Sequence, residues 1–375
     1  MLIGSLGIRL FMWLGPTIPL PPPLGVMASL TEVSVTNDAD ADDGFSLTLS
    51  VGRDSLFDYS LVSSGTFDPL TRVVIGVFMG LSLPEVLIDG VVTFSQLQPS
   101  NEPGQSTLTV MGKGLTQVLD LDERNGKFEN QPDFLIFTRL IAQYAQYGLV
   151  PQPTPTTDVP IMLQRIPRQH ETDLQFIRRL ASRNGFVFYI EPATLGVNRA
   201  YFGPEIRTTA PQSALTLNMG FRTNIDSLHF SNDALAPVGT RGTFVDPIFK
   251  LPIPIPSLPS LRIPPLSRSP APAQRTVRLR ESANENPAQA ATSAVATVSR
   301  APEAVRATGE VDAVRYGSVL RARKLVGVRG AGTSYDGFYF VRRVTHTLRP
   351  LAGEYRQSFT LSRDGTGALL PVVAP

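Results

Sequence analysis

The sequence contains no cysteine, which excludes disulfide bonds, thiolate metal ligands and a cysteine nucleophile. This absence fits a chain that folds in a reducing cytoplasm. Charge is also scarce, because Asp, Glu, Lys and Arg together make up 18% of the residues. The net charge of +2 gives no argument for a nucleic acid or an acidic membrane as partner. We therefore expect no nucleic-acid-specific site.

Histidine is rare, and its three copies do not form a recognisable site. His170, His229 and His346 lie in different segments without the spacing of metal ligands. No Gly-x-Ser-x-Gly elbow is present, and the glycines at 112 and 114 lack the strand–helix context of a phosphate-binding loop. The sequence thus predicts no catalytic residue, no metal site and no cofactor.

The sequence also lacks an unbroken hydrophobic run long enough to cross a membrane. Met1–Met27 is strongly apolar, with Arg9 as its only charged side chain, but prolines from position 16 onward interrupt it well short of about 20 residues. We expect residues 1–28 to form an apolar arm or a first strand that packs against its own domain or a neighbour. A cryptic targeting segment is the alternative.

The segment 37–44 is acidic and invites a test for a calcium loop. An EF-hand loop that begins at Asp38 needs glycine at its sixth position and an acidic residue at its twelfth. Those positions hold Asp43 and Leu49, so the pattern fails. The sequence predicts a solvated turn here.

Alternation of apolar and polar residues predicts a β domain over residues 29–115. Phe45–Val51 alternates with a period of two, as in a half-buried strand. Arg72–Met79, Val86–Phe94 and Ser106–Gly112 are further candidate strands, and glycines and prolines separate them.

An α/β insert is expected next, over residues 116–212. Pro132 suits a first helical position, and an apolar stripe follows it up to Gly148. The pattern of residues 169–190 predicts a helix that is followed directly by a strand. Thr172 has the spacing of a helix cap, Asp173 complements the helix dipole, and Gly185 can adopt the left-handed conformation that ends a helix.

The last part of the chain predicts a second β domain interrupted by a proline-rich arm. Residues 213–245 have a residue pattern typical of β-strands. Residues 246–280 alternate proline with apolar residues, which favours an extended arm that lies on a surface. Residues 281–375 then contain an alanine-rich helix near 281–300 and a closing hairpin.

The closing hairpin repeats the end of the first β domain. Val92–Pro99 aligns with Val344–Pro350, which places Phe94 opposite His346, and a second strand aligns Ser106–Val110 with Ser358–Ser362. Coincidence between two hairpins rich in Thr, Ser and Val is the alternative. If the repeat is real, the chain carries two similar β domains, one on each side of the insert.

The block 169–190 resembles the hub domain of phage late-control protein D and of the VgrG proteins. The positions that carry the resemblance are structural and perform no chemistry in that family; here they are Gln169, Glu171, Thr172, Asp173, Phe176, Leu180, Ala181, Gly185, Phe188 and Tyr189. It is strongest over residues 130–204 and 338–365. The proline-rich arm has no counterpart in it.

The resemblance implies a mainly β, α+β fold in which two similar β-barrel domains flank the insert. It implies a homotrimer that joins a six-fold inner tube to a three-fold spike, and other baseplate components as further partners. Three chains with two similar domains each present six equivalent surfaces to the tube. Strand residues expected at tube-facing or intersubunit surfaces are Val92, Phe94, Leu108, Val110, Val344, His346, Phe359 and Leu361.

Further expectations follow from the same resemblance. The chain would be assembled in the bacterial cytoplasm and become a component of a phage tail or a contractile injection particle, and the sequence does not distinguish a phage, a type VI apparatus and an extracellular injection system. VgrG proteins continue into an OB-fold and a β-helix, whereas this sequence stops at Pro375, so we expect a separate spike protein.

Two other functions remain open on the sequence. A particle-associated cell-wall hydrolase would use Glu171 and Asp173 as a carboxylate pair, although their place at a helix start explains them as cap and dipole partners. A free-standing two-domain β scaffold or adhesin would have no tube partner.

Overall fold

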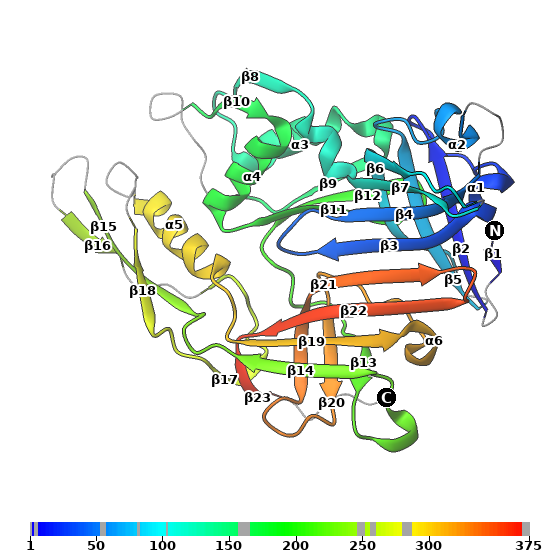
Figure 1. Ribbon diagram of the computed structural model, residues 1–375. Helices are drawn as coiled ribbons and strands as arrows, with labels where there is room; N and C mark the ends of the chain where they lie inside the picture. The colour runs from blue at the N-terminus through cyan, green and yellow to red at the C-terminus, as the bar shows by residue number, and fades with distance from the viewer. Residues whose placement is uncertain are drawn as a thin grey trace.

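The structure is a computed structural model that describes residues 2–3, 7–52, 58–80, 83–102, 104–156, 166–245, 252–255, 260–279 and 287–369. The fold is α+β and mainly β, as the sequence predicts (Figure 1). Thirteen of the described strands belong to one sheet, which runs without a break from the N-terminal half of the chain into the C-terminal half.

The first half of the sheet has the strand order β2-β5-β6-β7-β4-β3, with β1 at its edge. Residues 8–15, within the predicted arm or first strand, form a strand that pairs with β5 along its whole length. The elements of this half are β1 (Leu2–Ile3), β2 (Ile8–Gly15), α1 (Leu24–Ser29), β3 (Leu30–Asp38), β4 (Gly44–Val51), α2 (Ser60–Ser63), β5 (Arg72–Met79), β6 (Glu85–Gln98) and β7 (Ser106–Gly114).

The insert contains two helices packed on a small sheet, with a separate two-stranded ladder of β8 and β10. Its core is apolar and includes fully buried phenylalanines at 137, 176 and 202. Its elements are η1 (Leu115–Asp120), β8 (Glu123–Lys127), α3 (Asp133–Ala142), η2 (Ala145–Tyr147), β9 (Leu149–Pro153), β10 (Arg168–Thr172), α4 (Asp173–Asn184), β11 (Val187–Thr194) and β12 (Val197–Gly203).

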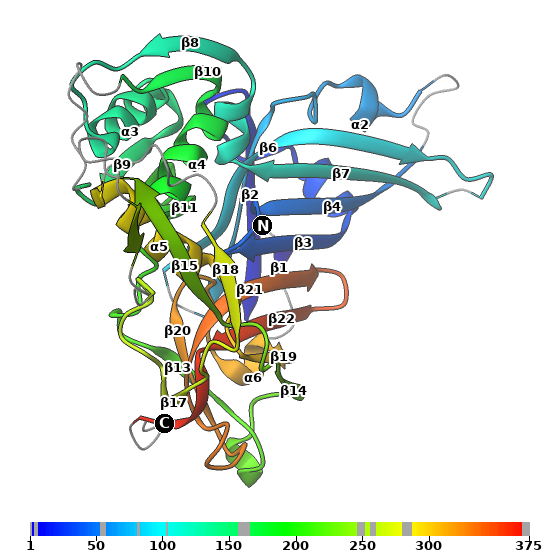
Figure 2. The ribbon, with the colours of Figure 1, turned by 90° about the vertical axis from the view of Figure 1, so that its left-hand side faces the viewer.

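The second half of the sheet has the order β13-β20-β21-β22-β19-β14. Figure 2 shows β21 and β22 lying next to β3 and β4 of the first half. Its elements are β13 (Gln212–Thr216), η3 (Gly220–Arg222), β14 (Ser227–Asn232), β19 (Val305–Asp312), α6 (Ala313–Tyr316), β20 (Leu325–Arg329), β21 (Gly337–Arg349), β22 (Glu354–Arg363) and β23 (Gly365–Ala368).

An excursion between β14 and β19 carries the proline-rich segment. Its elements are β15 (Val238–Val245), β16 (Pro252–Ile255), β17 (Ser267–Pro270), β18 (Arg275–Arg278) and α5 (Pro287–Arg300). Within the predicted arm, the described strands β16 and β18 pair with β15, and β17 pairs with β23. Arm residues 246–251, 256–259 and 280 lie outside the described residues. Helix α5 packs against α4 of the insert (Figure 1).

Five strands of each half are copies of one topology. The order β5-β6-β7-β4-β3 matches β20-β21-β22-β19-β14 strand by strand, whereas the outer strands differ, because β2 runs antiparallel to β5 and β13 runs parallel to β20. Backbone detail supports the match, because Leu70 before β5 and Arg323 before β20 both have a left-handed φ, 66° and 63°. Their N–H groups donate to Val92 and Val341, at 2.9 Å and 2.8 Å. The predicted repeat is therefore present in the fold.

The residue alignment of the repeat differs from the predicted one. Strands β6 and β21 each contain a bulge, between Val92 and Phe94 in β6 and between Val341 and Arg343 in β21. The bulges align Val92 with Val341, three residues before the predicted partner Val344. Phe94 therefore corresponds to Arg343, not to His346. Sequence similarity between short alternating strands does not fix register, whereas a bulge does.

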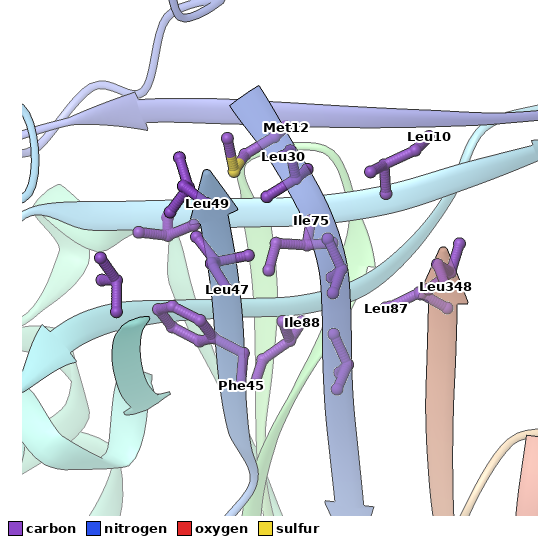
Figure 3. Close-up of a cluster of buried hydrophobic side chains, with 14 of the residues drawn as sticks. Leu10, Met12, Leu30, Phe45, Leu47, Leu49, Ile75, Leu87, Ile88 and Leu348 are labelled. Carbon is purple, nitrogen blue, oxygen red and sulfur yellow. The ribbon is translucent and has the colours of Figure 1, made fainter. Parts of the chain in front are cut away.

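The hydrophobic core of the first half also includes residues of the second half, which has a second core of its own. The first of these cores is built mainly by strands of the first half, and Figure 3 shows Leu348 of β21 approaching this cluster from the second half. Leu47 and Leu49 of β4 are fully buried in it. The halves thus share apolar burial as well as backbone pairing.

Candidate functional site

The two halves of the sheet meet where β3 pairs with β21. The pairing is antiparallel and runs from Asp38 opposite Arg343 to Val33 opposite Leu348. In its middle the hydroxyl oxygens of Thr36 and Thr345 lie 3.0 Å apart. We call this pairing the closed junction. It fully buries alternate side chains of β3 against the core.

Ion pairs hold the end of the closed junction, at the turn between β3 and β4. Arg323 donates to Asp43 at 2.7 Å, and the Nε atom of Arg343 donates to Asp38 at 2.5 Å. Asp38 and Asp43 are buried, so the prediction of a solvated turn is wrong for these two aspartates, whereas Asp40 and Ala41 at the tip of the turn are exposed as predicted. The sequence could not reveal this, because the arginines lie some three hundred positions further along the chain.

The same turn also contacts the insert. Arg178 of α4 pairs with Asp42, and the Arg323 guanidinium lies 4.6 Å from the centre of the Tyr189 ring. Burial lowers the pKa of Arg323, but the Asp43 carboxylate more than compensates and leaves that pKa raised. A buried cation therefore links the first half, the second half and the insert.

The repeat also contains the counterparts of the two junction strands. These two counterpart strands do not pair with each other within the chain. The counterpart of β3 is β14, which lies at the end of the sheet. The counterpart of the paired half of β21 is residues 93–98 of β6, which among the described residues pair on one side only, with β7. Both strands are largely exposed there, whereas β3 and β21 bury each other. We call these two strands the open edges.

A short sequence repeat, which hairpin similarity does not reveal, starts at the end of both β3 and β14. Asn-Asp-Ala-x-Ala occurs at 37–41 and again at 232–236. In each copy the aspartate caps its own turn: Asp38 accepts from the N–H of Asp40 at 2.8 Å, and Asp233 accepts from that of Leu235 at 2.9 Å. Comparing short identical segments of the sequence, in place of whole hairpins, reveals this repeat.

The residues that resemble the hub family build the insert and its contact with the repeat. Thr172 accepts from the N–H of Gln175 at 3.3 Å, as a helix cap, and Gly185 ends the helix at a φ of 68°. Phe176, Leu180, Ala181 and Phe188 belong to the insert core or pack against it.

The two carboxylates considered for hydrolysis are occupied by structural partners. Asp173 is fully buried and accepts from Gln169 at 2.6 Å, Tyr144 at 2.7 Å and Arg124 at 3.0 Å. Glu171 accepts from Arg179 at 2.7 Å. Burial and the Asp173 carboxylate also raise the pKa of Tyr144, so this phenol stays protonated.

Seven of the eight strand residues expected at tube-facing or intersubunit surfaces lie instead in the cores of this chain. The buried ones are Val92, Leu108, Val110, Val344, His346, Phe359 and Leu361. Phe94 alone among the eight is exposed, and it lies on an open edge. The reason is the period of two: the apolar positions of a half-buried strand face the core, so the free surface lies on the other face and at the edge.

The described part of the chain contains no cluster of three His, Cys, Asp or Glu residues arranged to hold a metal ion. Nor does it contain a helix long and apolar enough to span a membrane.

Solved structures with a similar fold come from phage tails and injection machines. A tail protein from Neisseria meningitidis matches 96% of this chain and 98% of its own, with 15% identity and a TM-score of 0.62. A component of the Escherichia coli type VI secretion system, described as similar to bacteriophage T4 tail proteins, matches 92% of this chain and 77% of its own, with 13% identity and a TM-score of 0.54.

A third match is a chain of the Francisella PdpA–VgrG complex, which covers all of this chain and 55% of its own, with 7% identity and a TM-score of 0.56. No protein-family model matches the sequence, and no curated protein matches it. At these identities the likeness is one of fold. The chain therefore has the fold shared by phage tail proteins and VgrG-like injection proteins, in agreement with the resemblance of its 169–190 block.

Proposed function

We propose that this chain is the structural baseplate hub of a contractile phage tail or contractile injection system. In this proposal it forms a homotrimer that joins a six-fold inner tube to a three-fold spike. The observation that carries the proposal is the duplicated sheet, in which one junction is closed within the chain and the equivalent open edges are left for another copy.

The geometry of the repeat supports a closed ring. If β14 of one copy pairs with residues 93–98 of the next, every junction around the ring has the same arrangement. Each chain then contributes two repeats, so three chains give six. A heterologous contact of this kind forms a ring only if its rotation closes, and six repeats match the symmetry of a six-fold tube.

The closed junction predicts the residue register between copies. The repeat alignment places Gln96 where Thr345 lies and Ser231 where Thr36 lies. Gln96 of one copy should therefore lie directly opposite Ser231 of the next.

The role of the hub is mechanical and needs no cofactor. It starts the first ring of the inner tube protein, holds a separate spike protein, contacts other baseplate components and moves with the tube when the sheath contracts. It assembles in the bacterial cytoplasm and works in the finished virion or injection particle. The structural partners of Glu171 and Asp173 argue against the rival function of cell-wall hydrolysis.

Electron microscopy of particles isolated from the native host through a tagged copy of this chain tests the proposal. We expect tubes that carry the tag at one end, with three-fold symmetry in averages of that end. Abundant tagged protein without a tube or spike would contradict the hub and favour the free-standing scaffold. Purified chain that digests cell walls and loses this activity on Glu171→Gln would favour the hydrolase.

A further inference from the structure

The excursion between β14 and β19 carries an excess of positive charge that the net charge of the whole chain conceals. Residues 234–286 contain three acidic residues and seven basic ones, namely Arg241, Lys250, Arg262, Arg268, Arg275, Arg278 and Arg280. The net charge of this segment is therefore +4, whereas that of the whole chain is +2 and that of the other residues is −2. Such an asymmetry is typical of a segment that meets an anionic partner.

Two of these arginines lie directly opposite each other in the small sheet of the excursion. This sheet has the strand order β16-β15-β18, and Figure 1 shows it at the left, next to α5 and apart from the main sheet. In the parallel pairing of β15 with β18, Arg241 is the partner of Arg278. Adjacent strands lie about 4.7–4.9 Å apart, so the two side chains begin at neighbouring positions on one face. Like charges in this arrangement repel each other.

The face that carries the two arginines is open to solvent. Val238 and Thr240 of β15 are buried, and because side chains alternate along a strand, Arg241 lies on the other face. Arg241 and all four residues of β18 are exposed. Among the described residues, no carboxylate pairs with Arg241, Arg275 or Arg278. The positive charge of this sheet is therefore available to a partner.

Strand β18 also has a free edge. Among the described strands it pairs only with β15. The N–H of Leu279 donates to the carbonyl oxygen of Arg241 at 3.0 Å. Backbone groups alternate in direction along a strand, so those of Val277 also face β15, whereas the N–H and C=O groups of Thr276 and Arg278 point to the free side. A free row of backbone groups is a template for pairing with another extended chain.

We propose that β18 binds an extended acidic segment of a partner protein as an additional strand. The backbone of the segment pairs with Thr276 and Arg278, and its carboxylates meet the side chains of Arg275 and Arg278. A peptide fits this edge better than a nucleic acid or a membrane, because only a peptide offers backbone groups that extend the sheet. This inference goes beyond the proposed hub, since it needs neither the homotrimer nor the tube.

The register of β18 fixes the spacing of the acidic residues in the partner. Arg275 and Arg278 are three positions apart, so their side chains lie on opposite faces of the sheet. An added strand places one residue opposite each arginine. The two acidic residues of the partner are therefore also three positions apart.

Fluorescence anisotropy of the full chain with labelled, amidated peptides tests the inference. The first probe, Ac-TVDVTEVT-NH2, carries its two carboxylates three positions apart. The second, Ac-TVDVETVT-NH2, carries them two positions apart, and the third, Ac-TVNVTQVT-NH2, carries none. We expect the first probe to bind about tenfold more tightly than either of the others, because only this spacing pairs both carboxylates with arginines.

Variants of the chain separate the two parts of the proposed contact. Arg278→Gln should weaken binding of the first probe by about tenfold, because it removes one ion pair. Arg268→Gln is the matched control, because Arg268 is also exposed but lies in β17, which pairs with β23. Thr276→Pro should abolish binding, because proline removes a backbone N–H that points to the free edge and leaves those that face β15. Circular dichroism should be unchanged in all three variants.

A charge exchange gives the strictest control. Arg275→Glu combined with Arg278→Glu should lose the first probe and bind Ac-TVKVTKVT-NH2, which the wild-type chain should not bind. Recovery by opposite charges would show that the side chains meet directly.

Several results would overturn the inference. These are equal binding of the first and third probes, equal effects of Arg268→Gln and Arg278→Gln, or binding of the first probe that survives Thr276→Pro. Binding of duplex DNA or phosphatidylglycerol vesicles in place of the first probe, lost in Arg278→Gln, would also overturn the peptide partner. Each of these results leaves the hub standing, because the hub is tested by the particles that the tagged chain assembles into.

Discussion

The hydroxyl oxygens of Thr36 and Thr345 lie 3.0 Å apart, although 309 residues separate them in the sequence. This contact joins two copies of one β topology inside a single chain. Its counterparts, Ser231 and Gln96, lie on the open edges of the same molecule. The chain therefore contains one junction between repeats that is already paired, and two further strands that could form an equivalent junction with another copy.

Removing the central cation of the closed junction should destabilise the fold strongly. Arg323→Met leaves Asp43 buried without its partner, and breaking a buried pair in this way costs about 3–5 kcal/mol. Urea unfolding measures the change in free energy. Arg356→Met is the matched control, because Arg356 pairs with Glu310 at the surface and should leave stability near the wild-type value. Equal effects of the two variants would show that Arg323 is not a structural link.

Helix α5 should depend on the glycine that ends α4. A Cβ atom at Gly185 would lie 2.9 Å from the Cα atom of Ala296, and its φ of 68° is also unfavourable for alanine. Gly185→Ala should therefore lose about 1–3 kcal/mol more than Gly196→Ala, which has a φ of 78° but open space around it. Thermal or urea unfolding compares the two. Equal losses would mean that α5 does not pack closely on α4.

Stability should fall in mild acid because of His346. Burial, and then the nearby Arg321, lower the pKa of His346 to about 3. The unfolded chain takes up this proton below about pH 6.5, whereas the folded chain does not until about pH 3. The folded state therefore loses about 1.4 kcal/mol per pH unit across that window, or roughly 2 kcal/mol between pH 7 and pH 5.

The variant His346→Gln isolates this contribution, because glutamine does not titrate and can still bond to Tyr355, which lies 2.9 Å from the His346 Nδ1 atom. Urea unfolding at pH 7 and pH 5 should show a smaller difference for the variant than for the wild type. The same pH dependence in both proteins would mean that His346 is protonated in the fold.

Local patterns predicted the parts of this protein that local interactions determine. The helix cap at Thr172, the left-handed stop at Gly185 and the strands of the first half follow from spacing and residue type alone. The repeat was also visible, but its alignment was three residues off because bulges, not side-chain similarity, set the register of β6 and β21.

The site required contacts between distant parts of the chain. Nothing near the aspartates of the β3–β4 turn indicates that arginines at 323 and 343 neutralise them. The free edge of β6 is likewise invisible in the sequence, because nothing in residues 93–98 indicates which strands pair with them. Only the pairing of β3 with β21 shows which edges are left open.

A disulfide across the predicted junction between copies tests the central claim most directly. Because the chain has no cysteine, Gln96→Cys with Ser231→Cys introduces the only two thiols. Thr36→Cys with Thr345→Cys is the positive control and should close within one chain at the mass of a monomer. The account predicts that mild oxidation links Gln96→Cys to Ser231→Cys into covalent trimers and nothing larger. Monomers alone, or a ladder that continues past three chains, would contradict it.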